Sequence, residues 1–260
     1  MGQPAPAVSP QERREHLLAY LHTHDHTSVV DLSAILGVSE VTVRKYLDQL
    51  EAQGLLTRTH GGALVSGRGR LERYFAAREQ EHLEEKRRIA QAAAALIQPG
   101  RQIFLDASTT ALQVARLIKD REDLVVVTNG LYTALELNFS DDITTIVVGG
   151  TMRHRSSSLV GRFGDDSLRR LRLDLGFFGA HAVTADDGLM DSDLAEAQLK
   201  QLLAGLSTTV VGLVDSSKLG ARSFFAFARP AEIHRLITDS AAPAATVAGL
   251  RAAGVAVDLV

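Results

Sequence analysis

The chain has 260 residues, of which 45% are hydrophobic and 23% are charged, a composition typical of a soluble protein with two domains. It contains no cysteine, which excludes disulfides, thiolate metal sites and thiol nucleophiles. No apolar run is long enough to span a bilayer, and residues 1–10 lack the charged start and apolar core of a secretory signal. We therefore expect a cytoplasmic protein with no membrane partner.

The net charge of −3 argues against a chain coated in basic charge but leaves room for a local basic surface. Residues 41–70 carry five Lys or Arg against two acids. On charge alone this indicates a solvated face, and a nucleic-acid partner is favoured only when the local structure of this segment is added. There is no GxxxxGKS/T loop and no GxGxxG motif after a strand, so no nucleotide cofactor is predicted. His22, His24 and His26 alternate in a polar loop with no evident fourth ligand, so no metal site is predicted.

Three short helices are predicted in the first 54 residues, the first from residue 9 to about residue 23. Ser28 caps the second helix and Gly37 stops it, while Ser39 caps the third and Gly54 ends it. The apolar side chains that follow helical spacing in the second and third helices are Leu32, Ile35, Leu36, Val43, Leu47 and Leu50. A tight glycine turn between two such helices predicts a helix-turn-helix.

Alternating residues 55–59 and 63–65 flank a His-Gly-Gly turn and predict a β-hairpin, so the helix-turn-helix would carry a wing. A protein–protein module with a structural hairpin is the alternative. The side chains expected to contact DNA lie at the helix starts, on the outer face of the third helix and at the tip of the wing. They are Ser28, Ser39, Glu40, Thr42, Arg44, Lys45, Arg58, His60 and Gly61.

The stretch GVSEVTVRKYLDQLEAQGLLTRTHGGALV resembles the DNA-binding domain of DeoR-type transcriptional regulators, and the resemblance extends over residues 11–66. It implies an α+β winged helix-turn-helix that binds double-stranded operator DNA. The chain departs from the family at Tyr46, where an aspartate is usual.

The segment after the wing is polar and glycine-rich at residues 66–70, which predicts a hinge. Residues 71–88 are dense in charge and predict a helix whose arginines, Arg73, Arg78 and Arg88, face solvent, with phosphate binding as the alternative. We divide the chain into a disordered tail (1–10), a winged helix-turn-helix domain (11–66), a linker or helix (67–85) and an α/β domain (86–260).

Strands and helices alternate from residue 89 onward, which predicts a mainly parallel sheet with a ligand site at the carboxyl ends of its strands. Hydroxyls and amides of Ser108, Thr109 and Thr110 at a helix start form an anion cradle, with a plain helix cap as the alternative. Gly149 and Gly150 follow another strand and would let a ligand approach the backbone.

The segments EKRRIAQAAAALIQPGRQIFLDASTTA, GGTMR and LVDSSKLG resemble the sensor domain of the same DeoR-type family. That domain is similar to ribose-5-phosphate isomerase and binds phosphorylated sugars. The resemblance implies that Ser108, Thr109, Thr110 and Lys218 hold the phosphate. It places Asp106, Asn129, Arg153 and Glu196 near the sugar.

Two other functions are weighed against a sensor. An active sugar-phosphate isomerase would need carboxylates that are missing from Phe178-Gly179-Ala180-His181, where the isomerase family has Asp-Gly-Ala-Asp. A DNA-binding protein with a purely structural second domain would not need polar strand ends. We therefore predict a non-enzymatic regulator, a repressor of a sugar-metabolism operon that responds to a phosphorylated sugar. It is expected to be a homo-oligomer, either a dimer or a tetramer.

Overall fold

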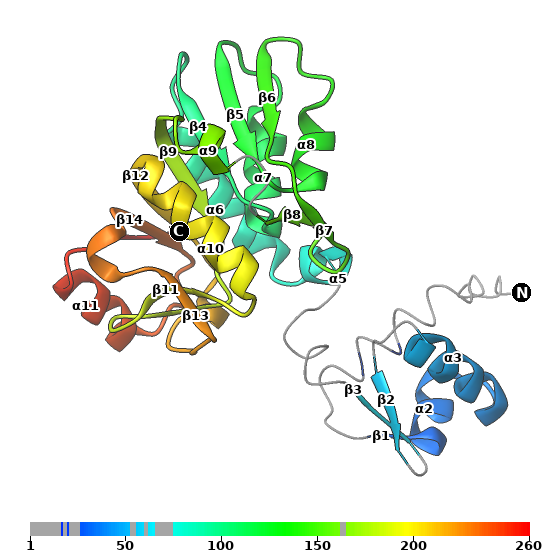
Figure 1. Ribbon diagram of the computed structural model, residues 1–260. Helices are drawn as coiled ribbons and strands as arrows, with labels where there is room; N and C mark the ends of the chain where they lie inside the picture. The colour runs from blue at the N-terminus through cyan, green and yellow to red at the C-terminus, as the bar shows by residue number, and fades with distance from the viewer. Residues whose placement is uncertain are drawn as a thin grey trace, which may run out of the picture. The chain divides into compact units, whose positions relative to one another are not determined.

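The computed structural model describes residues 17, 20, 27–52, 56–59, 62–65, 75–161 and 165–260. It separates into two compact units, Met1–Arg73 and Tyr74–Val260, which are described here one at a time (Figure 1). Among the described residues, no helix combines the length and the apolar character needed to cross a membrane.

The N-terminal unit contains the predicted pair of helices and the predicted hairpin. Its elements are β1 (Thr27–Ser28), α2 (Val29–Leu36), α3 (Glu40–Ala52), β2 (Leu56–Thr59) and β3 (Gly62–Val65). Both predicted boundaries of α2 are confirmed: Ser28 Oγ accepts a hydrogen bond from the Asp31 amide, and Gly37 adopts a left-handed φ of 62°. The three strands form an antiparallel sheet in the order β1-β3-β2, in which β1 was not predicted.

The core of this unit follows the predicted apolar stripes with one correction. Val43, Leu47 and Leu50 of α3 are buried, as is Leu32 of α2. Ile35, by contrast, is 48% exposed, so its assignment to the core is wrong. Val29, Leu32 and Leu36 lie on one face of α2 at i, i+3 and i+7, which turns Ile35 towards solvent.

The C-terminal unit is built on a parallel sheet of seven strands in the order β15-β14-β12-β9-β4-β5-β6. These strands are β4 (Gln102–Leu105), β5 (Leu124–Thr128), β6 (Ile143–Val147), β9 (Leu173–Phe178), β12 (Ser207–Leu213), β14 (Arg235–Thr238) and β15 (Ala256–Leu259). The helices are α5 (Phe75–Gln80), α6 (Leu83–Ala95), α7 (Thr109–Ile118), α8 (Leu131–Leu137), α9 (Asp165–Leu168), α10 (Leu194–Leu206) and α11 (Ala244–Ala252).

Two hydrophobic cores cover the two faces of this sheet, because successive side chains of a strand point to opposite sides. Phe177 joins the core formed with α6 and α7, while its neighbour Phe178 joins the core formed with α10 and α11. The predicted α/β domain with a parallel sheet is therefore confirmed.

Several smaller elements were not predicted. The strands β10 (Ala182–Thr184), β11 (Gly188–Asp191) and β13 (Phe225–Ala228) form a separate antiparallel sheet in the order β10-β11-β13. The strands β7 (Thr151–Arg153) and β8 (Ser158–Val160) form a hairpin, and residues Ser216–Lys218 and Pro230–Glu232 form single turns of 3-10 helix. The hairpin and the loop after β12 bring side chains to the carboxyl edge of the main sheet.

The predicted single helix over residues 71–88 is wrong. The described part consists of α5 and α6, which are separated by a break at His82, where φ is 50°. The helix α6 then continues past residue 88, because its face with Ile89, Ala90 and Ala93 is buried against the domain. The division between the units falls after Arg73, so α5 belongs to the C-terminal unit.

Candidate functional sites

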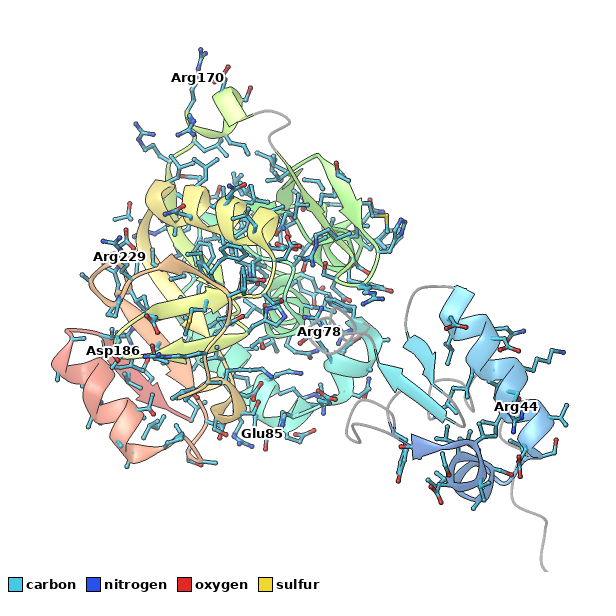
Figure 2. The ribbon with its side chains drawn as sticks, turned by 60° about the horizontal axis from the view of Figure 1, so that its bottom comes forward. Arg44, Arg78, Glu85, Arg170, Asp186 and Arg229 are labelled. Atoms are coloured by element: carbon cyan, nitrogen blue, oxygen red, sulfur yellow. The ribbon has the colours of Figure 1, made fainter. Side chains whose placement is uncertain are left out.

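The N-terminal unit presents the outer face of α3 to solvent. Arg44 and Lys45 are exposed on this face, and Arg44 Nη2 lies 3.3 Å from Glu40 Oε2 (Figure 2). Val41, 76% exposed, adds an apolar contact surface that was not predicted. A helix that follows a tight turn and exposes cations in its first two turns has the form of a DNA recognition helix.

The other predicted DNA contacts divide into three groups. Ser28, Ser39 and Thr42 are engaged within the unit, since Ser28 caps α2 and Ser39 Oγ lies 3.0 Å from Thr42 Oγ1. Arg58 lies in β2 opposite Ala63. His60 and Gly61 lie outside the described residues. Tyr46, which replaces the usual aspartate, is buried and contributes to the core.

In the C-terminal unit, a cavity opens where β4, β9 and β12 end, and we call it the strand-end cavity. Of the predicted effector residues, six line it: Ser108, Thr109, Thr110, Arg153, Glu196 and Lys218. Eight further ionisable side chains that line it were not assigned to the site from the sequence: Arg78, Glu81, His82, Lys86, His181, Asp191, Lys200 and Asp215. The remaining predicted residues, Asp106, Asn129, Gly149 and Gly150, do not line it.

Lys200 is the centre of a buried ionic cluster beside the cavity. Its ammonium group lies 3.0 Å from Asp106 Oδ2 and 2.8 Å from Asp191 Oδ2, and it donates to the Gly179 carbonyl at 3.0 Å. Burial alone would lower the pKa of Lys200, but the carboxylates of Asp191 and Asp106 outweigh burial and raise it. All three donors of the ammonium group are therefore used, and Lys200 is held in its charged form.

Asp106 joins two of the turns that form the cavity. Its carboxylate accepts hydrogen bonds from the amide of Ser108 at 3.0 Å and from the amide of Gly179 at 2.9 Å. Asp106 is fully buried, and so it positions the turns after β4 and β9 from beneath.

Glu196, one helical turn before Lys200 on α10, forms a second buried cluster at the cavity. Its carboxylate accepts from Arg153 Nη1 at 3.1 Å, from Asn129 Nδ2 at 3.3 Å and from the hydroxyl of Ser158. Asn129 is fully buried and also donates to the carbonyl of Leu159. Glu196 and Arg153 face the cavity, whereas Asn129 supports them from the interior.

The turn after β4 presents the start of α7 to the cavity. Ser108 Oγ caps the helix by accepting from the Ala111 amide at 3.1 Å, and the buried Thr109 and Thr110 begin it. The first amides of a helix lack acceptors within the helix and carry partial positive charge, so this edge of the cavity favours an anion.

Three cations face the cavity without a carboxylate in ion-pair contact among the described residues: Arg78, Lys86 and Lys218. Lys86 donates instead to the carbonyls of Arg78 and Glu81, and burial lowers its pKa to about 8. Burial likewise lowers the pKa of Arg78. The prediction that Arg78 faces solvent is wrong, because α5 packs against the domain with this side chain towards the cavity. Five Lys or Arg side chains line the cavity against four carboxylates, and this excess of one positive charge suits it to an anionic ligand.

Gly150 has a role within the fold, and neither it nor Gly149 lines the cavity. A Cβ on Gly150 would lie 2.2 Å from the carbonyl oxygen of Val160, and φ is 154° there. We expected a ligand to approach the backbone closely at these glycines. At Gly150 the strand β8 makes that close approach instead.

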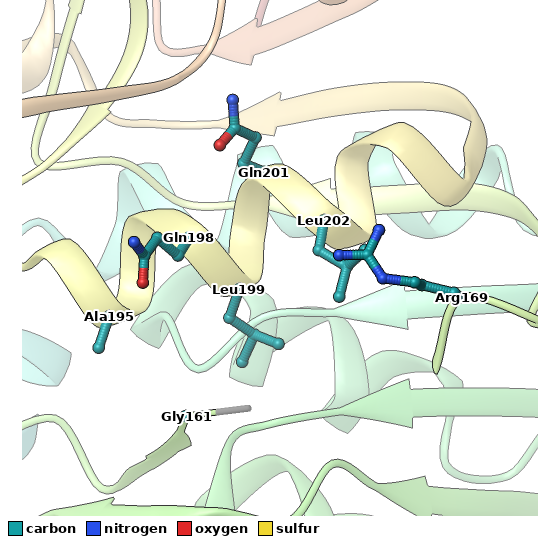
Figure 3. A pocket seen from close by; sticks show the side chains of 7 residues that line it. All are labelled: Gly161, Arg169, Ala195, Gln198, Leu199, Gln201 and Leu202. Atoms are coloured by element: carbon teal, nitrogen blue, oxygen red, sulfur yellow. The ribbon is translucent and has the colours of Figure 1, made fainter. Parts of the chain in front are cut away.

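A second hollow, of about 380 Å³, lies along the outward side of α10 (Figure 3). Its described lining holds a single charged side chain, Arg169, together with Gln198 and Gln201. It has no buried ionisable cluster among the described residues, so the strand-end cavity is the better candidate site.

Both units match known families. Residues 13–68 match the DeoR-like helix-turn-helix domain, and residues 81–240 match the DeoR C-terminal sensor domain. The chain belongs to the DeoR family of transcriptional regulators. It is thus a DNA-binding regulator whose second unit is a DeoR sensor domain, as the sequence predicted.

Three similar members of the DeoR family span most of this chain. The regulator GlpR of Haloferax volcanii is 38% identical over 249 residues, which are 95% of this chain and 97% of the relative. GolR of Listeria innocua is 36% identical over 89% of this chain and 91% of the relative. The glycerol-3-phosphate regulon repressor of Escherichia coli is 29% identical over 89% of this chain and 92% of the relative. All three are named as regulators or repressors and none as an enzyme, in agreement with the predicted function.

Among solved structures, ribose-5-phosphate isomerase A of Methanocaldococcus jannaschii is similar at a TM-score of 0.41 and 18% identity, covering 54% of this chain and 55% of that one. This score is too low to support a shared architecture, so the predicted likeness of the sensor domain to the isomerase stays a prediction.

Proposed function

We propose that the strand-end cavity binds a phosphorylated sugar, and that this binding changes the affinity of the winged helix for operator DNA. One observation carries the proposal. Three cations that have no carboxylate partner among the described residues line the same cavity as the start of α7. An anion bound there would compensate their charge and accept hydrogen bonds from the first turn of the helix.

The two sides of the cavity would bind different parts of the ligand. Lys218 and the amides and hydroxyls of residues 108–110 would hold the phosphate, with Lys86 beside them. Arg153 and Glu196 would contact the sugar hydroxyls, since a guanidinium donates and a carboxylate accepts hydrogen bonds. Asp106 and Asn129 would act indirectly, because both are fully buried beneath the residues that face the cavity.

The names of the relatives support the class of ligand and the direction of regulation. One relative is named as the repressor of a glycerol-3-phosphate regulon, which fits a phosphorylated polyol or sugar as the effector of this chain. We propose that the chain is likewise a repressor of a carbohydrate operon and acts as a dimer or tetramer. A two-fold oligomer would match two operator half-sites.

The test is a thermal-shift titration of the full chain with glycerol 3-phosphate, ribose 5-phosphate and fructose 1-phosphate against their unphosphorylated parents. Lys218→Ala should abolish the shift, whereas Lys119→Ala should keep it, because Lys119 is an exposed lysine paired with Glu136 on α8. DNA binding is measured by fluorescence anisotropy on a fragment that the protein selects from a random library. No shift with any phosphorylated compound would favour a purely structural second domain and overturn the proposal.

A further inference from the structure

The short helix α5 lies against the strand-end cavity and is attached to the domain through Phe75 and through Glu79, whose Oε1 lies 2.7 Å from Arg116 Nη1 of α7. The Phe75 ring is buried and stacks on Tyr132 of α8 at a centroid distance of 4.6 Å. The amide of Phe75 also donates to the carbonyl of Arg155 at 3.1 Å. These contacts hold one end of α5 and direct the next turn of the helix towards the cavity.

That next turn carries Arg78, which lines the cavity (labelled in Figure 2). Its Nε is buried and has no hydrogen-bond partner, and no carboxylate lies within ion-pair distance of its guanidinium among the described residues. The guanidinium does lie 5.8 Å from the centre of the Phe75 ring, a weak cation–π contact. A buried donor without an acceptor is costly, and an anion in the cavity would supply the missing acceptor for Nε of this half-buried side chain.

Lys86 connects the other end of α5 to the same cavity. Its ammonium group donates to the carbonyls of Arg78 and Glu81, at the carboxyl end of α5, where helix carbonyls lack partners within the helix. The same side chain lines the cavity together with Lys218 and the start of α7. An anion beside Lys86 would therefore act on the group that holds the end of α5.

We propose that Arg78 is a direct ligand of the effector anion, and that α5 is a lid which the bound anion holds against the cavity. The inference rests on the proposed sensing function and extends it to the element that responds. When the cavity is empty, docking of α5 leaves Arg78 Nε buried without an acceptor; when the anion is present, that cost is removed. Anion binding and docking of α5 then stabilise each other by linkage.

The position of α5 in the chain gives this coupling a consequence for regulation. The helix is the first described element after residues 66–74, the stretch that leads in sequence from the wing to the sensor domain. A change in the docking of α5 acts directly on the end of that stretch. The effector would thus reach the DNA-binding unit through α5.

The experiment compares the full-length wild type with Arg78→Gln and with the control Arg88→Gln, which removes the same charge from an exposed position on α6. Affinity for glycerol 3-phosphate and for inorganic phosphate is measured by calorimetry, and hydrogen exchange of residues 75–82 is followed by mass spectrometry. We expect Arg78→Gln to weaken binding by roughly tenfold or more, the usual scale for a lost hydrogen bond to a charged group. We also expect it to remove the slowing of exchange in α5, while Arg88→Gln behaves as wild type.

The outcomes separate this inference from the proposed function. If Arg78→Gln binds glycerol 3-phosphate as tightly as wild type and α5 is still protected, the lid is refuted while the sensor stands. If the wild type binds neither phosphate compound, both proposals fail. Arg78→Lys is the control for misfolding, because it keeps the positive charge and loses only the planar fork of donors. It should bind the anion more weakly than wild type and more tightly than Arg78→Gln. Equal affinity of the two variants would refute a direct contact.

Discussion

Gly179→Ala tests how rigidly the strand-end cavity is built without removing any charge from it. Gly179 directly follows β9, and a Cβ at this position would lie 2.4 Å from Ser108 Cβ and 2.6 Å from Ser108 Oγ. Since carbon atoms pack at roughly 3.5–4.0 Å, one of the two turns must move by about 1 Å. No positive φ is involved at Gly179, so the effect comes from steric overlap alone.

The expected loss follows from what the displaced atoms do. The amide of Gly179 donates to Asp106 at 2.9 Å, and its carbonyl accepts from Lys200 at 3.0 Å. Overpacking typically costs about 1–3 kcal/mol, and hydrogen bonds to charged groups contribute about 1.5–3 kcal/mol each. We expect the free energy of unfolding to fall by about 2–3 kcal/mol, because the turns can shift and keep part of these bonds. Affinity for a phosphorylated effector should fall by about tenfold or more, since Ser108 caps α7 at the wall of the cavity.

The assay is urea unfolding together with a glycerol 3-phosphate titration, with Gly205→Ala as the matched control. Nothing lies within 4 Å of a Cβ on Gly205 in α10, so the same change should raise stability there by up to about 1 kcal/mol and leave affinity unchanged. If Gly179→Ala unfolds and binds like wild type, the turn around Ser108 yields without cost, and the reasoning from a rigid cavity is refuted.

Two further predictions concern the recognition helix and the buried lysine. Arg44→Ala should weaken DNA binding and reduce the slope of the logarithm of affinity against the logarithm of salt concentration by about one unit. Glu40→Gln should strengthen binding, because it releases Arg44 from its ion pair. Equal slopes for wild type and Arg44→Ala would show that Arg44 does not contact DNA. Burial lowers the pKa of Lys86 to about 8, and a bound phosphate dianion should raise it again. Effector binding should therefore take up about half a proton at pH 8 and almost none at pH 6.5, and affinity should decline as pH rises above 8. Calorimetry in two buffers of different ionisation enthalpy measures this uptake, and an absence of uptake at pH 8 would contradict a contact with Lys86.

The elements that the sequence predicted correctly are those with a local signal. Ser28 and Gly37 mark the ends of α2 by their own backbone chemistry, and both boundaries are confirmed. The buried strands of the parallel sheet are continuous apolar runs such as residues 124–127, which are distinguishable from the polar segments around them. The short strands β10 and β11 lack such a run, whereas β13 lies in the apolar run of residues 224–228, which was not assigned to a strand. All three are held by pairing with one another.

The charged residues of the cavity were harder to predict because their burial is decided by tertiary packing. Arg78 lies in a run of charges that resembles a solvated helix, and only the docking of α5 turns it inward. Lys86 did carry a signal: it precedes Ile89, Ala90 and Ala93 at i+3, i+4 and i+7, and thus lies on the buried face of α6. Lys200 likewise follows Glu196 by one helical turn, a spacing that places both on the same face of α10.

The state of the ionisable groups explains how such a cavity serves binding instead of proton transfer. A general acid or base needs a pKa near the working pH and a free position for the proton. The pKa of Lys200 is raised by its two carboxylates, and its three donors are occupied. The carboxylate of Glu196 accepts from Arg153, Asn129 and Ser158, so its oxygens are already engaged before any ligand arrives. The cavity thus offers a ligand cations, helix amides and a Glu196 carboxylate already held by its neighbours, and these groups bind without exchanging protons on carbon. The charge arrangement of this sensor domain therefore favours a reversible ligand over a substrate.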